Sequence, residues 1–426
     1  MCGRRTPAPF DILCGYVCFM ADEFDKLKRE IQSGTRVICL SGLTSVAAKA
    51  LVLSKLQAET EKSFAVVTES NSEMENWATD LGYFLNDDQF AIISLPSFEA
   101  DPYSGVSPHA ETQERRALAL WQLGQLRQRK NNFVILSARS LVQRTVTPIE
   151  IANLGCVLVR EKDSAPEILI EKLTSGGYVR EDPIFGPGQF SVRGGIVDVW
   201  SPDSAAPVRI EFFGDTVESV RAFDPDTQLS TGQLEKIAIA PMREFAVSPQ
   251  DLRDWAFFAG ERFSDDKFKR NLKDRTDFAG EGEPFSGWEF LIPLVKPFEG
   301  TVFDHLSDCV FVIDEPSAVE QTLASHYEHL NSTFDAITES GEVGLAPNEL
   351  FITPDDLRTK LEKTLSLEFR ALGKTAAGTD EEFAVGETTK AKPLFLFPAS
   401  AKTTEIEFQS RSTRRFHGNI AAFVTE

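Results

Sequence analysis

Apolar residues in the first 140 positions form short runs that alternate with amphipathic stretches. The short runs predict buried strands over residues 35–41, 64–68, 91–95 and 133–137. Apolar residues at helical spacing predict helices over residues 22–31, 45–56, 72–85 and 111–127. Strands that alternate with helices indicate a parallel α/β layer. A further apolar run at 309–313 predicts another buried strand.

A different pattern occupies residues 177–223, where apolar and polar residues alternate around glycine-containing turns. Gly194-Gly195 separates two such runs, and a Gly-Gly pair supplies the positive φ angles of a two-residue hairpin turn. A second hairpin is predicted from 208–213 and 216–223, with Gly214-Asp215 as its turn. One face of each hairpin is then apolar: Phe190, Val192, Val197 and Val199 in the first, Val208, Ile210, Phe212 and Val217 in the second.

The segment from residue 35 to residue 56 has the order strand, glycine-containing turn, helix, which is the context of a phosphate-binding loop. Such a loop needs GxxxxGK[ST], where the lysine reaches the outer phosphates and the hydroxyl holds Mg²⁺. Counting from Gly42, the second glycine position holds Ala47, the lysine position Ala48 and the hydroxyl position Lys49. The order of strand, turn and helix is present, but the residues that would bind phosphate and Mg²⁺ are missing, so we expect no nucleotide cofactor.

The predicted strand 309–313 ends in Asp314-Glu315. An apolar strand that ends in two acids is typical of a Mg²⁺-ATP site. Acids at this position also cap helices in α/β proteins that bind no nucleotide. Because no intact phosphate loop accompanies the pair, we interpret it as a vestige and expect no ATP hydrolysis.

Composition restricts the classes of function. The chain has 426 residues, of which 42% are hydrophobic and 26% charged, and its net charge is −21. This acidity argues against a broad nucleic-acid surface. No apolar run approaches the ~18 residues of a membrane span. The six cysteines show no CxxC spacing, which argues against a disulfide framework or zinc site and favours the cytoplasm.

Two histidines and three arginines stand out as candidate chemistry. His326 and His329 lie three apart on a predicted helix, and without a third ligand nearby we expect surface residues and no metal site. Arg180, Arg193 and Arg209 are spread through the predicted hairpins of an acidic protein. They are either ordinary charges on the wet face of an antiparallel sheet or a site for an acidic partner.

Three spaced elements carry a family resemblance: Tyr178-Val-Arg180, Gly188 to Gly194, and Pro207 to Asp215. They resemble the second domain of the excision-repair helicase UvrB. They resemble more closely the equivalent domain of the bacterial transcription-repair coupling factors (Mfd). The resemblance implies that this domain docks onto the damage-recognition protein UvrA.

The resemblance also implies which residues make the contact. Two of the three UvrB arginines that face UvrA match Arg180 and Arg193, and the third falls on Ser191. Phe190 and Arg209 are secondary candidates.

Two other segments are similar to these families. Residues 95–108 resemble the coupling factors, whereas UvrB has a longer, tyrosine-rich insert here that grips DNA. Only Tyr103 stands in this short loop, so we expect weak binding to damaged DNA. Asp314-Glu315-Pro-Ser falls where UvrB has Asp-Glu-Ser-His.

The resemblance covers roughly residues 25–426. The implied fold class is α/β: a degenerate helicase-like (P-loop-type) parallel α/β domain with an inserted small β-rich α+β domain, plus the start of a further α/β domain. The expected organisation is a tail (1–24), the α/β domain (25–150 and 246–370), the UvrA-binding β-rich domain (151–245), a linker (371–392) and the start of a third, truncated domain (393–426).

The expected function is the N-terminal part of a coupling factor that recruits UvrA to stalled RNA polymerase. In the family, an ATP-driven DNA translocase displaces the polymerase, and RNA polymerase and DNA are bound by regions that we do not find in this chain. A UvrB-like helicase that itself binds ATP and damaged DNA is the first alternative. A free-standing UvrA-binding adaptor is the second.

Overall fold

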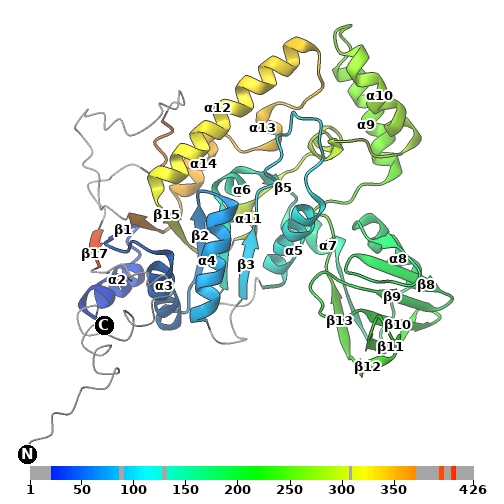
Figure 1. Cartoon of the computed structure of the whole chain (residues 1–426), viewed down its shortest axis with the longest axis horizontal. Helices are drawn as coiled ribbons and strands as arrows, with labels where there is room; N and C mark the ends of the chain where they lie inside the picture. Colours follow the sequence, from blue (N-terminus) through cyan, green and yellow to red (C-terminus); the bar gives the residue numbers. More distant parts are fainter. Residues whose placement is uncertain are drawn as a thin grey trace, which may run out of the picture.

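The computed structural model describes residues 21–85, 91–126, 132–306, 309–370, 393–397 and 404–408. Most of the predicted tail (1–24) and the whole predicted linker (371–392) lie outside the described residues, as does most of the predicted third domain (393–426). The described parts contain two large sheets and two small two-stranded ones (Figure 1).

The first sheet has seven strands in the order β17-β1-β16-β15-β2-β4-β3, and every neighbouring pair is parallel. This confirms the predicted parallel α/β layer. The strands are β1 (Val37–Ser41), β2 (Ser63–Thr68), β3 (Ala91–Leu95), β4 (Asn132–Ser137), β15 (Cys309–Asp314), β16 (Ser366–Arg370) and β17 (Thr404–Glu407).

Helices cover both faces of this sheet, which explains why its strands are continuously apolar. In β2, Phe64 and Val66 pack into one core, and Ala65 and Val67 into the other. The first core includes α2 (Ala21–Ser33), α3 (Val46–Thr60) and α4 (Asn71–Phe84). The second includes α5 (Ala110–Leu126), α6 (Ala138–Val142), α7 (Pro148–Leu154), α11 (Val302–His305), α12 (Pro316–Ser340), α13 (Pro347–Leu350) and α14 (Pro354–Leu361).

The second sheet has six strands in the order β12-β11-β10-β9-β8-β7, at the lower right of Figure 1. The strands are β7 (Val179–Arg180), β8 (Gln189–Arg193), β9 (Ile196–Val199), β10 (Val208–Phe213), β11 (Thr216–Phe223) and β12 (Ser230–Gln233). All pairs are antiparallel except β7 with β8. A two-stranded sheet of β6 (Cys156–Val159) and β13 (Lys236–Ile239), together with α8 (Pro166–Ser175), closes its core.

Both predicted hairpins are confirmed, with their apolar residues on the core side. In each turn, however, only the first residue has a positive φ angle, +60° at Gly194 and +58° at Gly214. This is the pattern of a type II′ turn. The prediction that both residues of the Gly-Gly turn need positive φ is therefore wrong.

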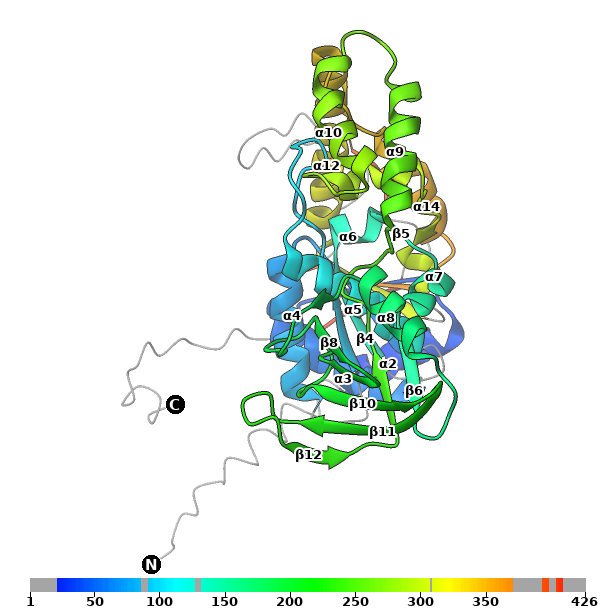
Figure 2. The ribbon, with the colours of Figure 1, turned by 90° about the vertical axis from the view of Figure 1, so that its right-hand side faces the viewer.

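Two helices follow the second sheet in the chain. They are α9 (Pro249–Arg262) and α10 (Lys269–Glu281), which form the antiparallel pair at the top of Figure 2. Two short 3₁₀ helices follow, η1 (Trp288–Phe290) and η2 (Ile292–Leu294). The short strands β5 (Arg144–Thr145) and β14 (Gly300–Thr301) pair antiparallel with each other.

The described residues beyond 392 pack on the first sheet. The sequence predicts the start of a further α/β domain there, but β17 pairs in parallel with β1 as an edge strand. Leu394, Leu396 and Phe397 pack against the core that contains α12. The described parts of this stretch therefore extend the first layer.

A buried ion pair joins the two parts of the molecule. Arg116 in α5 is 0% exposed and binds both carboxylate oxygens of Glu244, each at 3.2 Å. Its Nη1 also donates to the carbonyl of Pro96 at 2.6 Å. Glu244 lies just after the β-rich part of the chain, so this pair fixes where the chain returns to the α/β layer.

We predict that Arg116→Leu lowers the free energy of unfolding by about 3–5 kcal/mol, because Glu244 would remain as a buried, uncompensated charge. The double variant Arg116→Leu/Glu244→Leu should recover most of this loss. The control Arg115→Ala removes a half-exposed arginine that pairs with Glu75 and should cost less than about 1 kcal/mol. Urea unfolding measures all three, and equal costs for Arg115→Ala and Arg116→Leu would contradict the prediction.

Candidate functional site

Arg193 and Arg209 lie on the face of the second sheet opposite its core, whereas Arg180 lies on the edge strand β7. Arg180 is exposed, and its side chain makes no hydrogen bond or ion pair with any residue that the structure describes. Arg193 ends β8, and its side chain is 47% exposed. The two are therefore accessible positive charges on neighbouring strands.

Asp198 in β9 organises the arginines, although the sequence did not single it out. It is 1% exposed, on the face opposite the domain core. Its Oδ2 accepts from Nη2 of Arg193 at 2.7 Å and from Nη2 of Arg209 at 2.9 Å, and its Oδ1 accepts from Nε of Arg209 at 2.7 Å. A buried carboxylate is stable only when it is paired in this way. The pairing of β9 with β10, two strands of different hairpins, places Asp198 beside Arg209, and the sequence alone does not give that register.

Arg209 is held from several sides. Its Nη2 also donates to Oε1 of Gln228 at 3.1 Å, and its guanidinium lies 4.7 Å from the ring centre of Phe223. Its side chain is 23% exposed. Hydrogen bonds to Asp198 outweigh burial and raise the pKa of Arg209. The structure thus gives Arg209 an anchoring role, and it stays a secondary candidate for the partner contact.

Phe190 requires a correction. It is 2% exposed and packs in the core of this sheet with Val197 and Val199, so it has a structural role in place of the predicted partner contact. Ser191, at the position of the third UvrB arginine, is 1% exposed and offers no surface to a partner.

The degenerate nucleotide site keeps the backbone of a phosphate loop. Gly42 follows β1 with a φ angle of +80°, and α3 begins after Ser45. The Oγ of Ser45 accepts from the backbone N–H of Ala48 at 3.2 Å. The helix N-terminus that would face a phosphate is therefore capped by the chain itself.

Lys49 fills the place where a nucleotide-binding protein would hold its metal ion. Its Nζ lies 2.6 Å from Oδ1 of Asp314 and 2.8 Å from Oε1 of Glu315. Asp314 also accepts from Nε1 of Trp77 at 2.7 Å. Burial lowers the pKa of Lys49, but the two carboxylates outweigh burial and leave the pKa above its ordinary value. The structure thus brings these three predicted residues together as an internal ion cluster.

The C-terminal strand closes the same loop from outside. The backbone N–H of Phe408 donates to the carbonyl of Ser41 at 2.8 Å. A Cβ at Gly42 would overlap the carbonyl oxygen of Phe408. The loop backbone is therefore in contact with protein where a phosphate would have to approach.

Tyr103 is part of the packing between a loop and α12. Its hydroxyl donates to the carbonyl of Leu345 at 3.0 Å, and its ring lies 5.8 Å from that of Phe334. Nothing in this arrangement presents an aromatic side chain to DNA.

The histidine prediction is wrong for His326, which is 8% exposed and packs edge-on against Phe351. Burial is the largest cause that lowers its pKa to about 3, and Arg139 and His329 add to it, while Asp101 opposes them. His329 is exposed and lies 2.9 Å from a carboxylate oxygen of Asp101. Among the described residues, no group of three or more His, Cys, Asp or Glu is arranged to hold a metal ion.

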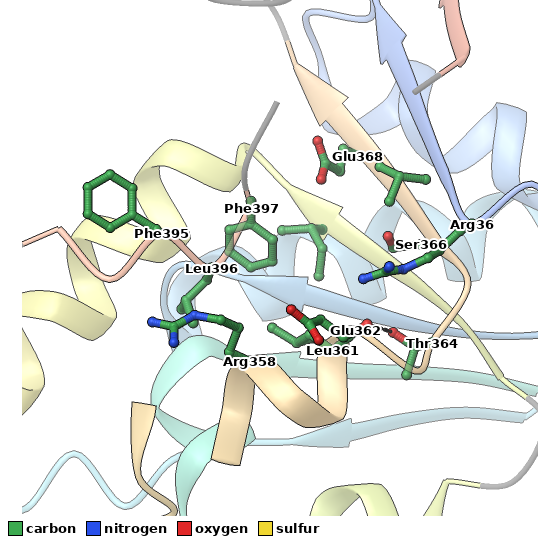
Figure 3. Close-up of a pocket in the computed structure, with 12 residues that line it drawn as sticks. Arg36, Arg358, Leu361, Glu362, Thr364, Ser366, Glu368, Phe395, Leu396 and Phe397 are labelled. Carbon is green, nitrogen blue, oxygen red and sulfur yellow. Dashed lines mark hydrogen bonds between the residues drawn. The ribbon is translucent and has the colours of Figure 1, made fainter. Parts of the chain in front are cut away.

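A cavity of about 320 Å³ lies elsewhere (Figure 3). Arg36 and Ser366 line one side of it, and Leu396 and Phe397 the other. Its Arg358 donates to the carbonyl of Leu394 at 2.8 Å. None of the residues predicted to bind a partner or a nucleotide lines this cavity.

None of the described helices has the length and hydropathy needed to cross a lipid bilayer.

Comparison with known proteins matches residues 157–245 to the family described as UvrB interaction domain. The chain is 30% identical over 358 residues to a transcription-repair-coupling factor of Myxococcus xanthus, a match that covers 81% of this chain and 29% of the relative. The corresponding protein of Haemophilus influenzae is 25% identical over 329 residues, covering 76% and 28%. That of Bacillus subtilis is 28% identical over 232 residues, covering 54% and 19%. The chain thus spans less than a third of the length of these curated relatives.

We predict that Mg²⁺-ATP does not stabilise this protein, because Lys49 occupies the acids and no lysine stands at the phosphate position. A ligand at about 100 times its Kd would add about 2.7 kcal/mol to the free energy of unfolding. Thermal melting with and without millimolar Mg²⁺-ATP, and an ATPase assay with DNA, measure this. ATP hydrolysis that disappears in Asp314→Ala would contradict it.

We predict that His326 makes stability fall in mild acid. Its folded pKa of about 3 lies below its ordinary value of 6.5, so the unfolded chain binds the proton first and stability is lost as pH falls through 6.5 towards 3. From pH 7.5 to 5.5 this one group should cost about 1.4 kcal/mol. Urea unfolding at both pH values measures this loss. His326→Gln should lack that increment, and an unchanged pH dependence in His326→Gln would refute the assignment.

Proposed function

We propose that this chain, which carries the UvrB-homology module of the transcription-repair coupling factors, is a docking platform that recruits UvrA. The single observation that carries the proposal is a coincidence in position. The residues matched to the UvrB interaction domain, 157–245, are those that form the second sheet and display Arg180 and Arg193.

The chemistry of this surface suits an acidic partner. An arginine presents a planar fork that binds a carboxylate through two hydrogen bonds. Arg193 is attached to a strand within a six-stranded sheet, and one of its nitrogens is bonded to buried Asp198. A side chain that is already oriented loses less conformational entropy when a partner binds.

Arg180 complements Arg193 from the adjacent strand. In the parallel register of β7 and β8, Arg180 pairs with Phe190, so it projects from the face of Phe190, whereas Arg193, three positions further along, projects from the other face. Because β7 is the edge strand and neighbouring strands lie about 4.8 Å apart, a partner that covers this edge of the sheet reaches both arginines. We therefore assign the primary contact to this pair.

The first sheet serves in this proposal as a scaffold without motor activity. Its nucleotide frame is filled by Lys49 and contacted by Phe408. In the whole coupling factor, recruitment of UvrA would take place at a stalled RNA polymerase, and the translocase that displaces the polymerase would lie in the part of the relatives that this chain does not match.

We predict that Arg180→Ala and Arg193→Ala each weaken binding to UvrA by about 2 kcal/mol, the size expected of interface hot spots. Isothermal titration of the purified chain with UvrA measures the affinity, and a thermal melt of each variant checks the fold. The matched control is Arg115→Ala/Arg253→Ala, two arginines outside the second sheet, which should bind as the unmodified chain does.

The double variant Arg180→Ala/Arg193→Ala decides the case. Undiminished binding by this variant, with UvrA active towards the unmodified chain, would exclude the two arginines as the contact.

A further inference from the structure

We propose that the docking surface extends along the rim of the second sheet from Arg193 to Phe213, that Phe213 enters an apolar recess of the partner, and that buried Asp198 is the positioning residue for Arg193. The proposal rests on the proposed function, because it names further residues of the same partner-binding surface. The partner chemistry it requires is an acidic patch beside an apolar pocket.

Phe213 is an exposed aromatic side chain with no role in the fold. It is 80% exposed, the largest exposed fraction among the large apolar residues of the described chain. It is the last residue of β10, directly before the Gly214-Asp215 turn. An exposed phenylalanine side chain is unfavourable in water, so its burial by a partner favours binding.

The register of the sheet places Phe213 on the same rim as Arg193. Ile196 at the start of β9 pairs with Arg193 on one side and with Glu211 on the other. The backbone N–H of Phe212 donates to the carbonyl of Gly195 at 2.8 Å. The ends of β8 and β10 therefore meet at the Gly194-Gly195 turn, and about 10 Å, two strand spacings, separates the two strands.

Alternation along β10 places Phe213 on the same face as the arginine network. Ile210 is in the domain core, and Phe212 packs against that core. Arg209, between the core residues Val208 and Ile210, points to the opposite face and reaches Asp198. Phe213 follows Phe212, so its side chain points to the face of Arg209 and Arg193.

Asp198 acts on this surface through Arg193. Its side chain is 1% exposed, so a partner cannot touch it. It binds Nη2 of Arg193 at 2.7 Å, while Asp182 lies 3.8 Å from Nε of the same arginine. Nη1 of Arg193 has no partner among the described residues, and it is the donor left for a carboxylate of the partner.

The test is titration of UvrA with the full chain and with Phe213→Ser and Asp198→Asn. The expected result for Phe213→Ser is a loss of affinity of about tenfold or more, about 1.4 kcal/mol. The matched control is Phe257→Ser in α9, which removes another exposed phenylalanine, 63% exposed and outside the second sheet. It should leave the affinity unchanged.

A double-mutant cycle separates positioning from a general structural effect. Asp198→Asn should weaken binding in the unmodified chain but cause no further loss in an Arg193→Ala background. Equal losses in both backgrounds would overturn the positioning role. If Asp198→Asn does not fold, Phe213→Ser alone decides the extended surface.

The outcomes also separate this inference from the proposed function. No binding of UvrA by the unmodified chain would overturn the proposed function itself. Binding by the unmodified chain that Phe213→Ser leaves unchanged would overturn only the extension to Phe213.

Discussion

The structure of the first sheet depends on how the chain neutralises charge at the end of β15. Asp314 is 8% exposed, and an unpaired carboxylate at this depth would be unstable. Lys49 and Trp77 supply its partners from α3 and α4, the helices that follow β1 and β2. A cation is needed at this point of the fold, and the chain supplies it as an ammonium group in place of a bound metal. The same interaction that stabilises the layer therefore occupies the carboxylates of both acids.

The second sheet also contains a buried carboxylate that needs cationic partners, but there the pairing leaves one cation accessible to solvent. Asp198 is also buried and also needs cationic partners, but here they are two arginines that remain partly exposed. One of them, Arg209, is held in place by further contacts with Gln228 and Phe223. The other keeps part of its guanidinium towards solvent. One buried carboxylate thus divides chemically identical residues into an anchoring arginine and an arginine available to a partner.

Much of the fold followed from periodicity alone, because strands buried on both faces and hairpins with glycine turns have strong local signals. The break between α9 and α10 could not be predicted from periodicity, because Phe263 and Phe268 continue the apolar pattern across the break and are both buried. Burial of His326 and Phe190 depends on which elements cover them, and a single sequence does not show this. Asp198 was equally hidden: only cross-strand register makes its arginine partners visible. The edge position of β17 depends on pairing with β1 from the opposite end of the chain.

That pairing has a consequence for how the protein is made. Val37 of β1 pairs with Ser366, and Ile38 with Thr404, so β1 acquires its neighbours only after synthesis has reached β16 and β17, more than three hundred residues later. Strands β8 to β12 pair with strands next to them in the sequence. Local pairing closes small loops and forms quickly, whereas distant pairing is slow. During synthesis, the second sheet, which carries Arg193 and Phe213, is thus able to form before β16 and β17 complete the first sheet.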